Sequence, residues 1–516
     1  MAPVAERSWT IRCFRCGCEL FDESDYSTFT YNCAKCQEEL WPKASQLNVP
    51  AEVVWEKGAL AHRVERKTMA SAPIAGTKYL PFMPLTDPKK AAAVSLGEGG
   101  TPLIRLRGIE RQVELRFGLA LRIFGKVEGA NPTGSFKDRG SLVEAAKALE
   151  LKLPEIILAS TGNMAASIAA YSNRERRVGL GCHIVVPKSA DATKLIQAVV
   201  HNASLYRVDG QFSLAVDLAE AFFQREVKRA AKGHRGRFYL GGDYCYRMEG
   251  EKTAAYEIVE QLKARDNVPP DAVIVPVGAG TNLAGITKGF RELKELDLGV
   301  QTMPRMYGAQ PFANLTDEKR PKPEEARSRM TTVMPHDGDY RLQMLAQFKP
   351  EFGAVLVKNP LDGLKVIAAY KETGGSTVGV LLGDAVDLEH NPDEHGFDVL
   401  SAKWDLARFE SLFVETSAAT ALAALYKLAD ESKVKDEETV ALDLTGDGLK
   451  DTWVVAKHRL QLKVSSSVRA GQEAPSDLGP LIPTAPGSDG SMTVGDASVV
   501  ALARHVDRAI RARVGT

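Results

Sequence analysis

Short apolar runs alternate with helical patterns from about residue 46 to residue 463, and this alternation constrains the fold more than any other feature. Each run is followed by a glycine or polar turn and then by a stretch rich in Ala, Leu, Glu and Lys. Continuous apolar runs of this length indicate strands that are buried on both faces, as in parallel sheets covered by helices. The pattern therefore predicts an α/β fold built from βαβ units. The clearest runs are Ile156–Ser160, His183–Pro187, Val273–Gly278 and Val440–Gly446.

The 516 residues exceed what one hydrophobic core usually organises, so we expect several globular parts. Residues 1–45 are a small cysteine-bearing module, and residues 46–463 are the α/β region. Residues 464–495, rich in Ser, Pro and Gly, indicate a linker or a tail that follows the surface. Residues 496–516 predict a helix whose apolar stripe docks on the body of the protein. The alternative is that this stripe meets a second subunit, in a homodimer.

The charge balance argues against nucleic acid or an anionic membrane as a partner, because 66 basic residues oppose 66 acidic ones. No apolar run approaches the ~18 residues that span a bilayer. The first residues lack the basic stretch and apolar core of a secretory signal. Seven cysteines in a long chain of this kind are typical of a reducing compartment, so we expect a cytoplasmic protein.

Two C-x-x-C pairs near the N-terminus have the spacing of a zinc ribbon. Cys13 with Cys16 and Cys33 with Cys36 form two knuckles, with sixteen residues between them. Thiolates three residues apart in a tight turn can reach one tetrahedral ion, and two such turns complete a closed four-sulfur shell. We therefore predict a structural Zn²⁺ whose removal loosens the first 45 residues without directly touching the chemistry. Cys18 is a fifth sulfur and leaves the ligand set ambiguous, and the alternative is reduced thiols in a disordered arm.

The segment from Asn131 to Gly140, NPTGSFKDRG, carries the main candidate for a reactive group. Pro132 and Gly134 indicate a turn, and a helical pattern begins beyond Lys137. A lysine at such a junction can face a cleft with its ammonium partly desolvated, which lowers its pKa toward the nucleophilic amine form. An arbitrary lysine near a helix start is more often a solvated charge.

The ten-residue string resembles the lysine motif of the threonine synthases, and further motifs of that family follow in order. SLGEGGTPL at residues 95–103 is similar to the segment SLGEGxTPL, and residues 160–163 to the SGN loop. Residues 277–282, VGAGTN, resemble the glycine-rich phosphate loop, and LTGDGLKD at residues 444–451 is close to LTGHGLKD. Some members also carry an N-terminal ribbon. The resemblance covers roughly residues 10–460.

This resemblance implies the fold-type-II pyridoxal-phosphate architecture, which is similar to the tryptophan synthase β subunit. Two parallel-sheet α/β domains hold the cofactor between them, and the smaller, at about residues 145–245, is inserted in the larger. Lys137 then carries pyridoxal 5′-phosphate as a Schiff base, Asn163 bonds the ring's phenolic oxygen, and Thr445 meets the pyridine nitrogen. Backbone amides of the glycine-rich loop close on the phosphate at a helix N-terminus. The cofactor-binding residues implied are Phe136, Lys137, Asn163, Gly278, Ala279, Gly280, Thr281, Asn282 and Thr445.

The resemblance also implies the reaction of threonine biosynthesis, in which a lyase converts O-phosphohomoserine and water to threonine and phosphate through a Lys137 aldimine. Residues 246–253, YRMEGEKT, resemble the segment YRxEGQKT, whose arginine faces the substrate phosphate. A guanidinium fits a phosphate in bidentate fashion, so Arg247 is the predicted phosphate ligand. The other predicted substrate-binding residues are Thr101, Ser160 and Thr161.

Several departures from the family pattern fall on the substrate side, while the cofactor set is intact. They are Met164 for Thr, Ala279 for Asn, Tyr244-Cys245 for Asn-Pro and Asp447 for His. The leading hypothesis is a threonine synthase or a relative that acts on a phosphorylated amino acid. The first alternative is a paralogous β- or γ-replacement enzyme on another phosphorylated or activated amino acid, such as O-phosphoserine in a cysteate-synthase-like reaction. The second is a non-catalytic homologue.

Overall fold

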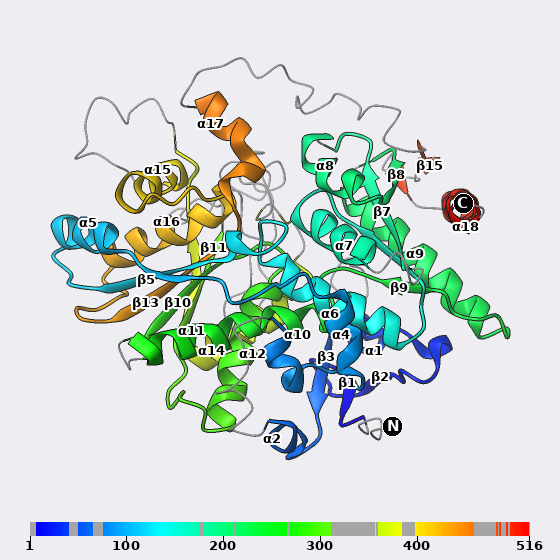
Figure 1. The fold of residues 1–516 in the computed structure, drawn as a ribbon, viewed down its shortest axis with the longest axis horizontal. Coiled ribbons are helices and arrows are strands. Elements are labelled where there is room, and N and C mark those ends of the chain that lie inside the picture. Colours follow the sequence, from blue (N-terminus) through cyan, green and yellow to red (C-terminus); the bar gives the residue numbers. More distant parts are fainter. Residues whose placement is uncertain are drawn as a thin grey trace.

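The computed structural model describes most of the α/β region and parts of both ends (Figure 1). The predicted linker 464–495 lies mostly outside the described residues. Those described are 7–40, 50–64, 76–174, 180–190, 192–210, 212–265, 269–310, 355, 357, 360–383, 398–458, 481–482, 485–486, 492–493 and 496–514.

The larger sheet has six strands in the order β12-β11-β10-β13-β5-β4. All neighbouring pairs are parallel except β4 with β5. Successive residues of β10 pack into different cores, with Ile274 on one face and Val273 and Val275 on the other, as the two-residue period of a strand requires. The strands are β4 (Leu103–Arg105), β5 (Arg122–Val127), β10 (Ala272–Pro276), β11 (Arg305–Gln310), β12 (Ser376–Gly379) and β13 (Thr439–Leu444).

Helices cover both faces of this sheet, so its strands are buried throughout (Figure 1). One face carries α5 (Arg107–Phe117), α15 (Val399–Glu410) and α16 (Thr416–Asp430). The opposite face carries α11 (Thr253–Arg265), α12 (Thr281–Glu295) and α14 (Gly363–Thr373), and α10 (Cys245–Glu251) packs on α12 and on α6 (Lys137–Glu150).

The second sheet is parallel throughout, with the order β14-β8-β7-β6-β9. Its strands are β6 (Glu155–Ala159), β7 (Gly181–Pro187), β8 (Ser204–Val208), β9 (Phe238–Leu240) and β14 (Leu481–Ile482). The helices that alternate with them in sequence are α6 (Lys137–Glu150), α7 (Asn163–Arg174), α8 (Ala192–Val200) and α9 (Phe212–Ala230). The four strands predicted from apolar runs are confirmed, with ends shifted by at most two residues.

The C-terminal helix α18 (Asp496–Val514) packs on α9. It therefore docks on the body of the protein, which is the first of the two alternatives predicted. Its buried stripe contains Val499, Leu502, Ala503, Val506 and Ile510. The predicted linker also contributes β14 to the second sheet, so part of it is strand rather than irregular chain. No described helix is long and apolar enough to cross a bilayer.

The N-terminal module is a three-stranded antiparallel sheet in the order β2-β1-β3. Because β3 completes this sheet, the module extends past the predicted boundary at residue 45. Its elements are β1 (Trp9–Cys13), β2 (Glu19–Phe21), η1 (Tyr26–Thr28), α1 (Ala34–Leu40) and β3 (Ala51–Trp55). The remaining elements are α2 (Ala59–Arg63), η2 (Gly76–Phe82), α4 (Pro88–Val94), η3 (Glu128–Ala130), η7 (Gly448–Asp451), α17 (Thr452–His458), β15 (Ala485–Pro486) and β16 (Met492–Thr493).

Candidate active site

Three neighbouring parallel strands end at one edge of the larger sheet, and each is followed by a predicted site segment. The lysine segment follows β5, the glycine-rich loop follows β10, and Thr445 follows β13. The backbone N–H of Phe136 donates to the carbonyl of Thr445 at 3.1 Å, and Ser135 pairs with Gly446. The carboxyl edge of a parallel sheet is where such folds bind ligands. The fold therefore brings Lys137 and Thr445 to the same edge, although they lie far apart in sequence.

The glycine-rich loop leads directly into α12. Gly280 has a left-handed backbone with φ +95°, and a Cβ at this position would lie 2.8 Å from Val366 Cγ2, so a side chain is excluded twice. The free N–H groups at the start of a fifteen-residue helix suit an anion such as a phosphate. Asn282 Nδ2, predicted to bind the cofactor, donates to Asp443 Oδ2 at 2.6 Å. Thr281, which is also predicted to bind the cofactor, is the first residue of the helix and is buried.

Lys137 is the first residue of α6, and its ammonium lies between two carboxylates. Nζ is 2.8 Å from Asp243 Oδ1 and 3.4 Å from Glu251 Oε1. Burial acts to lower the pKa of Lys137, but the negative charges of Asp243 and Glu251 outweigh it and the pKa is raised. The predicted lowering is therefore wrong for this arrangement. The prediction considered desolvation alone and did not include the two acidic partners.

Asp243 and Glu251 are the site residues that sequence reasoning missed. One signal was present: the chain has Glu251 where the family segment YRxEGQKT has Gln. The contact itself depends on how closely α10 packs against α6. A Cβ on Gly140 would lie 2.5 Å from Arg247 Cγ, and one on Gly250 would overlap the carbonyl of Arg139. These two glycines let the helices approach until Glu251 reaches Lys137.

Arg247 is wholly buried on α10, and protein groups take up its guanidinium. Nε donates to the carbonyl of Gly242 at 3.0 Å and Nη1 to the carbonyl of Lys137 at 3.1 Å. Nη2 donates to Ser141 Oγ at 3.3 Å and forms an ion pair with Glu144. These contacts use four of the five N–H donors of the guanidinium. In this arrangement Arg247 positions the start of α6, and its role as a ligand of the substrate phosphate stays a prediction.

The other predicted substrate and ring contacts lie in two places. Asn163 begins α7, and its Nδ2 donates to Glu415 Oε2 at 2.7 Å; the Glu415 N–H donates to the Gly446 carbonyl, which places Asn163 near Thr445. Ser160 Oγ accepts from Ala165 N at 3.0 Å, and Thr161 beside it is half-buried. Thr101 is buried in an ion network instead. Its hydroxyl donates to Glu128 and accepts from Arg139, as expected for a structural side chain.

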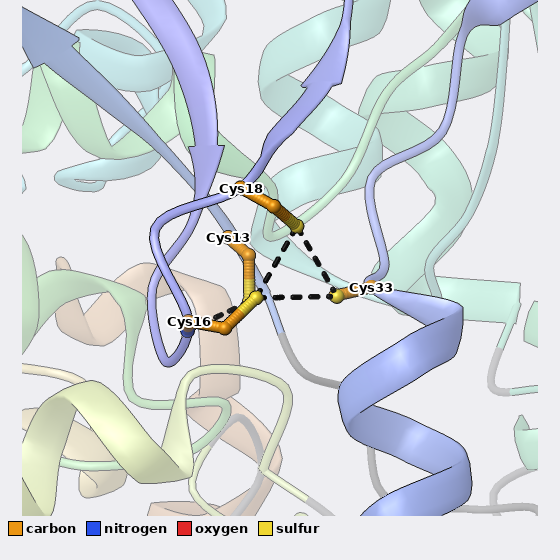
Figure 2. A group of neighbouring side chains, drawn as sticks. All are labelled: Cys13, Cys16, Cys18 and Cys33. Atoms are coloured by element: carbon orange, nitrogen blue, oxygen red, sulfur yellow. Dashed lines mark hydrogen bonds between the residues drawn. The ribbon is translucent and has the colours of Figure 1, made fainter.

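The N-terminal cysteines converge as Figure 2 shows, in a grouping that differs from the predicted one. The sulfur atoms of Cys13, Cys16, Cys18 and Cys33 lie within 4.8 Å of one another. Cys36 Sγ is 3.7 Å from Cys13 Sγ, so all five predicted sulfurs share one cluster. Zn–S bonds of about 2.3 Å in a tetrahedron place sulfurs about 3.8 Å apart. The Cys16–Cys33 and Cys18–Cys33 distances of 3.8 and 3.7 Å fit such an ion.

This cysteine module contacts the segment that carries the site residues. The Tyr31 ring stacks on Tyr244 with centroids 4.8 Å apart, and Tyr246 packs edge-on against Phe21 and donates to Glu23. Tyr244 and Tyr246 immediately precede Arg247 at the start of α10. The module therefore supports α10, and the prediction that metal loss does not directly touch the chemistry stays a prediction.

Removal of a bound metal with a chelator is therefore expected to loosen two regions together. Amide hydrogen exchange should speed up across residues 7–55 and also in α10, while β10 and β13 keep their protection, because only the first two depend on the cysteine cluster. Cys33→Ser should reproduce this pattern and lose the metal, whereas Cys182→Ser, whose thiol is in β7, should keep it. If hydrogen exchange in α10 is unchanged after metal loss, the cysteine module does not stabilise α10.

Comparison with known proteins agrees with this geometry. The family described as "Pyridoxal-phosphate dependent enzyme" matches residues 94–357, about half of the chain. The chain is 33% identical over 401 residues to the threonine synthase of Methanocaldococcus jannaschii, covering 78% of this chain and 86% of the relative. It is 29% identical over 446 residues to the threonine synthase of Methanosarcina acetivorans, covering 86% and 93%. A Bacillus threonine synthase is 33% identical over 390 residues, covering 75% and 93%. The chain belongs to the pyridoxal-phosphate dependent enzyme family, with the fold-type-II architecture.

Proposed function

We propose that this protein is a lyase of the threonine synthase type, which converts O-phosphohomoserine and water to threonine and phosphate. The observation that carries the proposal is the meeting of the Lys137 segment, the glycine-rich loop and Thr445 at the ends of three neighbouring strands. The curated relatives named threonine synthase support the choice of substrate. A cytoplasmic location and a structural Zn²⁺ at the cysteine cluster belong to the same proposal.

The residues present fit pyridoxal 5′-phosphate. Lys137 Nζ is the amine that would hold its carbonyl carbon, and the N–H groups of Gly278 to Asn282 would hold its phosphate. The Thr445 hydroxyl would meet the ring nitrogen, and Asn163 the ring oxygen. When bound, this cofactor supplies an electron-withdrawing ring that stabilises negative charge on the substrate carbon.

The chain's own contribution to the reaction would be positioning and proton transfer. Lys137 Nζ would be the base and acid that moves protons on the substrate. Helix α6 holds this nitrogen in place through Arg247, which bonds the Lys137 carbonyl. Glu251 is wholly buried and Asp243 is only slightly exposed, which limits the access of bulk water to those protons.

A second candidate is a replacement enzyme that acts on another activated amino acid, and the surroundings of Arg247 favour it. Its guanidinium is engaged by Glu144, Ser141 and two carbonyls. Asp243 and Glu251 add two carboxylates beside Lys137. An acidic surrounding of this kind disfavours a phosphate dianion and favours a substrate whose leaving group carries less negative charge.

A substrate screen separates the two candidates. The proposal predicts that purified protein with pyridoxal phosphate releases inorganic phosphate from O-phosphohomoserine and forms threonine in equal amount. Release of phosphate from O-phosphoserine would establish a replacement enzyme but overturn the argument from the acidic surroundings, whereas consumption of an activated amino acid without phosphate release would support both. If no amino acid alters the visible spectrum of the bound cofactor, the chain is a non-catalytic homologue.

A further inference from the structure

Glu251 lies between two cations, the ammonium of Lys137 and the guanidinium of Arg247. Its side chain is wholly buried at the end of α10. Oε1 lies 3.4 Å from Lys137 Nζ and 3.9 Å from Arg247 Nη1. Oε2 has no hydrogen-bond partner among the described residues. A buried carboxylate with an unpartnered oxygen is costly, whereas a carboxylic acid can carry its proton there.

The charged groups that face Glu251 are Lys137, Arg247 and Asp243. Burial raises the pKa of Glu251 to about 7, and the two cations only partly offset this effect. The neighbouring Asp243 behaves differently. Burial acts to raise its pKa, but Lys137 and Arg247 outweigh burial and hold the pKa below its usual value. One of the two carboxyls beside Lys137 thus stays ionised, while the other changes its protonation near neutral pH.

We propose that Glu251 is the proton store of Lys137: it accepts the proton that Nζ must lose before the nitrogen can bond to carbon, and it returns that proton when the nitrogen is freed. The inference rests on the proposed function, because it assigns to Lys137 the carbon–nitrogen bond of a pyridoxal-phosphate enzyme. In the transfer, one N–H bond of the ammonium breaks, its electron pair stays on nitrogen, and an O–H bond forms on Glu251. The pair carries no net charge before or after, and no further reactant is needed.

Two features make Glu251 the store in preference to other groups. Asp243 is closer to Nζ, but its low pKa makes its carboxylate a poor proton acceptor. Glutamine, which the family segment has at this position, can donate and accept hydrogen bonds but cannot take up a proton at neutral pH. The chain therefore carries a titratable group where the pattern has a neutral one of nearly the same shape.

Proton counting during cofactor binding tests this inference apart from turnover. The full-length protein, stripped of cofactor with phenylhydrazine, is titrated with pyridoxal 5′-phosphate at pH 8 by calorimetry in two buffers of different ionisation enthalpy. Wild-type protein keeps the proton of Lys137 on Glu251. Glu251→Gln sends that proton to solvent and should release about one more proton per site. Asp243→Asn is the matched control and should release no more than wild type.

The pH dependence gives a second measure. Below about pH 7 Glu251 is already protonated before the cofactor arrives and cannot take another proton. The difference between wild type and Glu251→Gln should therefore shrink as the pH falls through 7. The inference is overturned if wild type and Glu251→Gln release equal numbers of protons at pH 8. It is also overturned if Asp243→Asn, and not Glu251→Gln, releases the extra proton. Absence of both binding heat and a visible band in every protein would instead overturn the proposed function. Glu251→Ala, which also lacks the carboxyl, replaces the Gln variant if that one does not fold.

Discussion

Lys137→Ala is expected to abolish the visible absorbance of bound pyridoxal phosphate and to lower turnover on the order of 10³-fold or more. The variant lacks the nitrogen that bonds the cofactor and moves protons on the substrate. The phosphate-binding loop and Thr445 remain, so weak, non-covalent cofactor binding should persist. The visible absorbance of the cofactor and single-turnover assays check this result.

The control for this variant is Lys152→Ala, which removes an exposed lysine just beyond α6. It should keep both the visible band and the activity. A Lys137→Ala protein that still shows the band would assign the cofactor bond to another lysine, and the proposed function would then lose its central residue. If the band is lost while phosphate release continues, the reaction does not depend on a cofactor bound to Lys137.

Arg247→Ala is expected to destabilise the protein by about 3–5 kcal/mol, because it leaves the buried Glu144 without its cation. It also removes the bond to the Lys137 carbonyl, so the start of α6 should become less well fixed. Urea unfolding followed by circular dichroism measures the first effect. The double variant Arg247→Met with Glu144→Leu removes both charges and should recover part of the stability, because it avoids the unpaired charge but leaves the Gly242 and Lys137 carbonyls without their donor.

The same variant decides between two roles for the arginine. If Arg247→Ala keeps its unfolding free energy and only raises the KM for O-phosphohomoserine, the guanidinium is available to the substrate phosphate, as the sequence motif predicts. If stability falls and the remaining activity shows an unchanged KM, the arginine positions α6 in the way that its contacts indicate.

Local sequence was sufficient for the strands and for placing Lys137 at the start of a helix. Val273 to Val277 form a continuous apolar run, and a run of this kind is stable only when both faces of the strand are covered. Lys137 and Gly280 each stand in a short motif that resembles one of the threonine synthase family, and this resemblance is why both were predicted before the fold was known. The cysteine pairs were predicted by the same kind of short-range spacing.

Contacts between distant segments were not predictable in this way. Cys18 joins the cysteine cluster because β1 and β2 fold back on each other, whereas the C-x-x-C spacing left its place in the ligand set open. Arg247 was expected to face a substrate, but its guanidinium meets Glu144, a residue 103 positions earlier in the chain. Such a pairing depends on helix packing and leaves no periodic trace in the sequence.

The sequence by itself determined an α/β fold of the pyridoxal-phosphate dependent family, with Lys137 at the start of a helix, because periodicity and short motifs act within a few residues. Only the tertiary structure decided the charge state around that lysine. Asp243 and Glu251 lie 106 and 114 residues further along the chain, and the close approach of α10 to α6 brings them to Nζ. The pKa of a buried group depends on every charge nearby in space, so it could be assigned only once these segments were placed together.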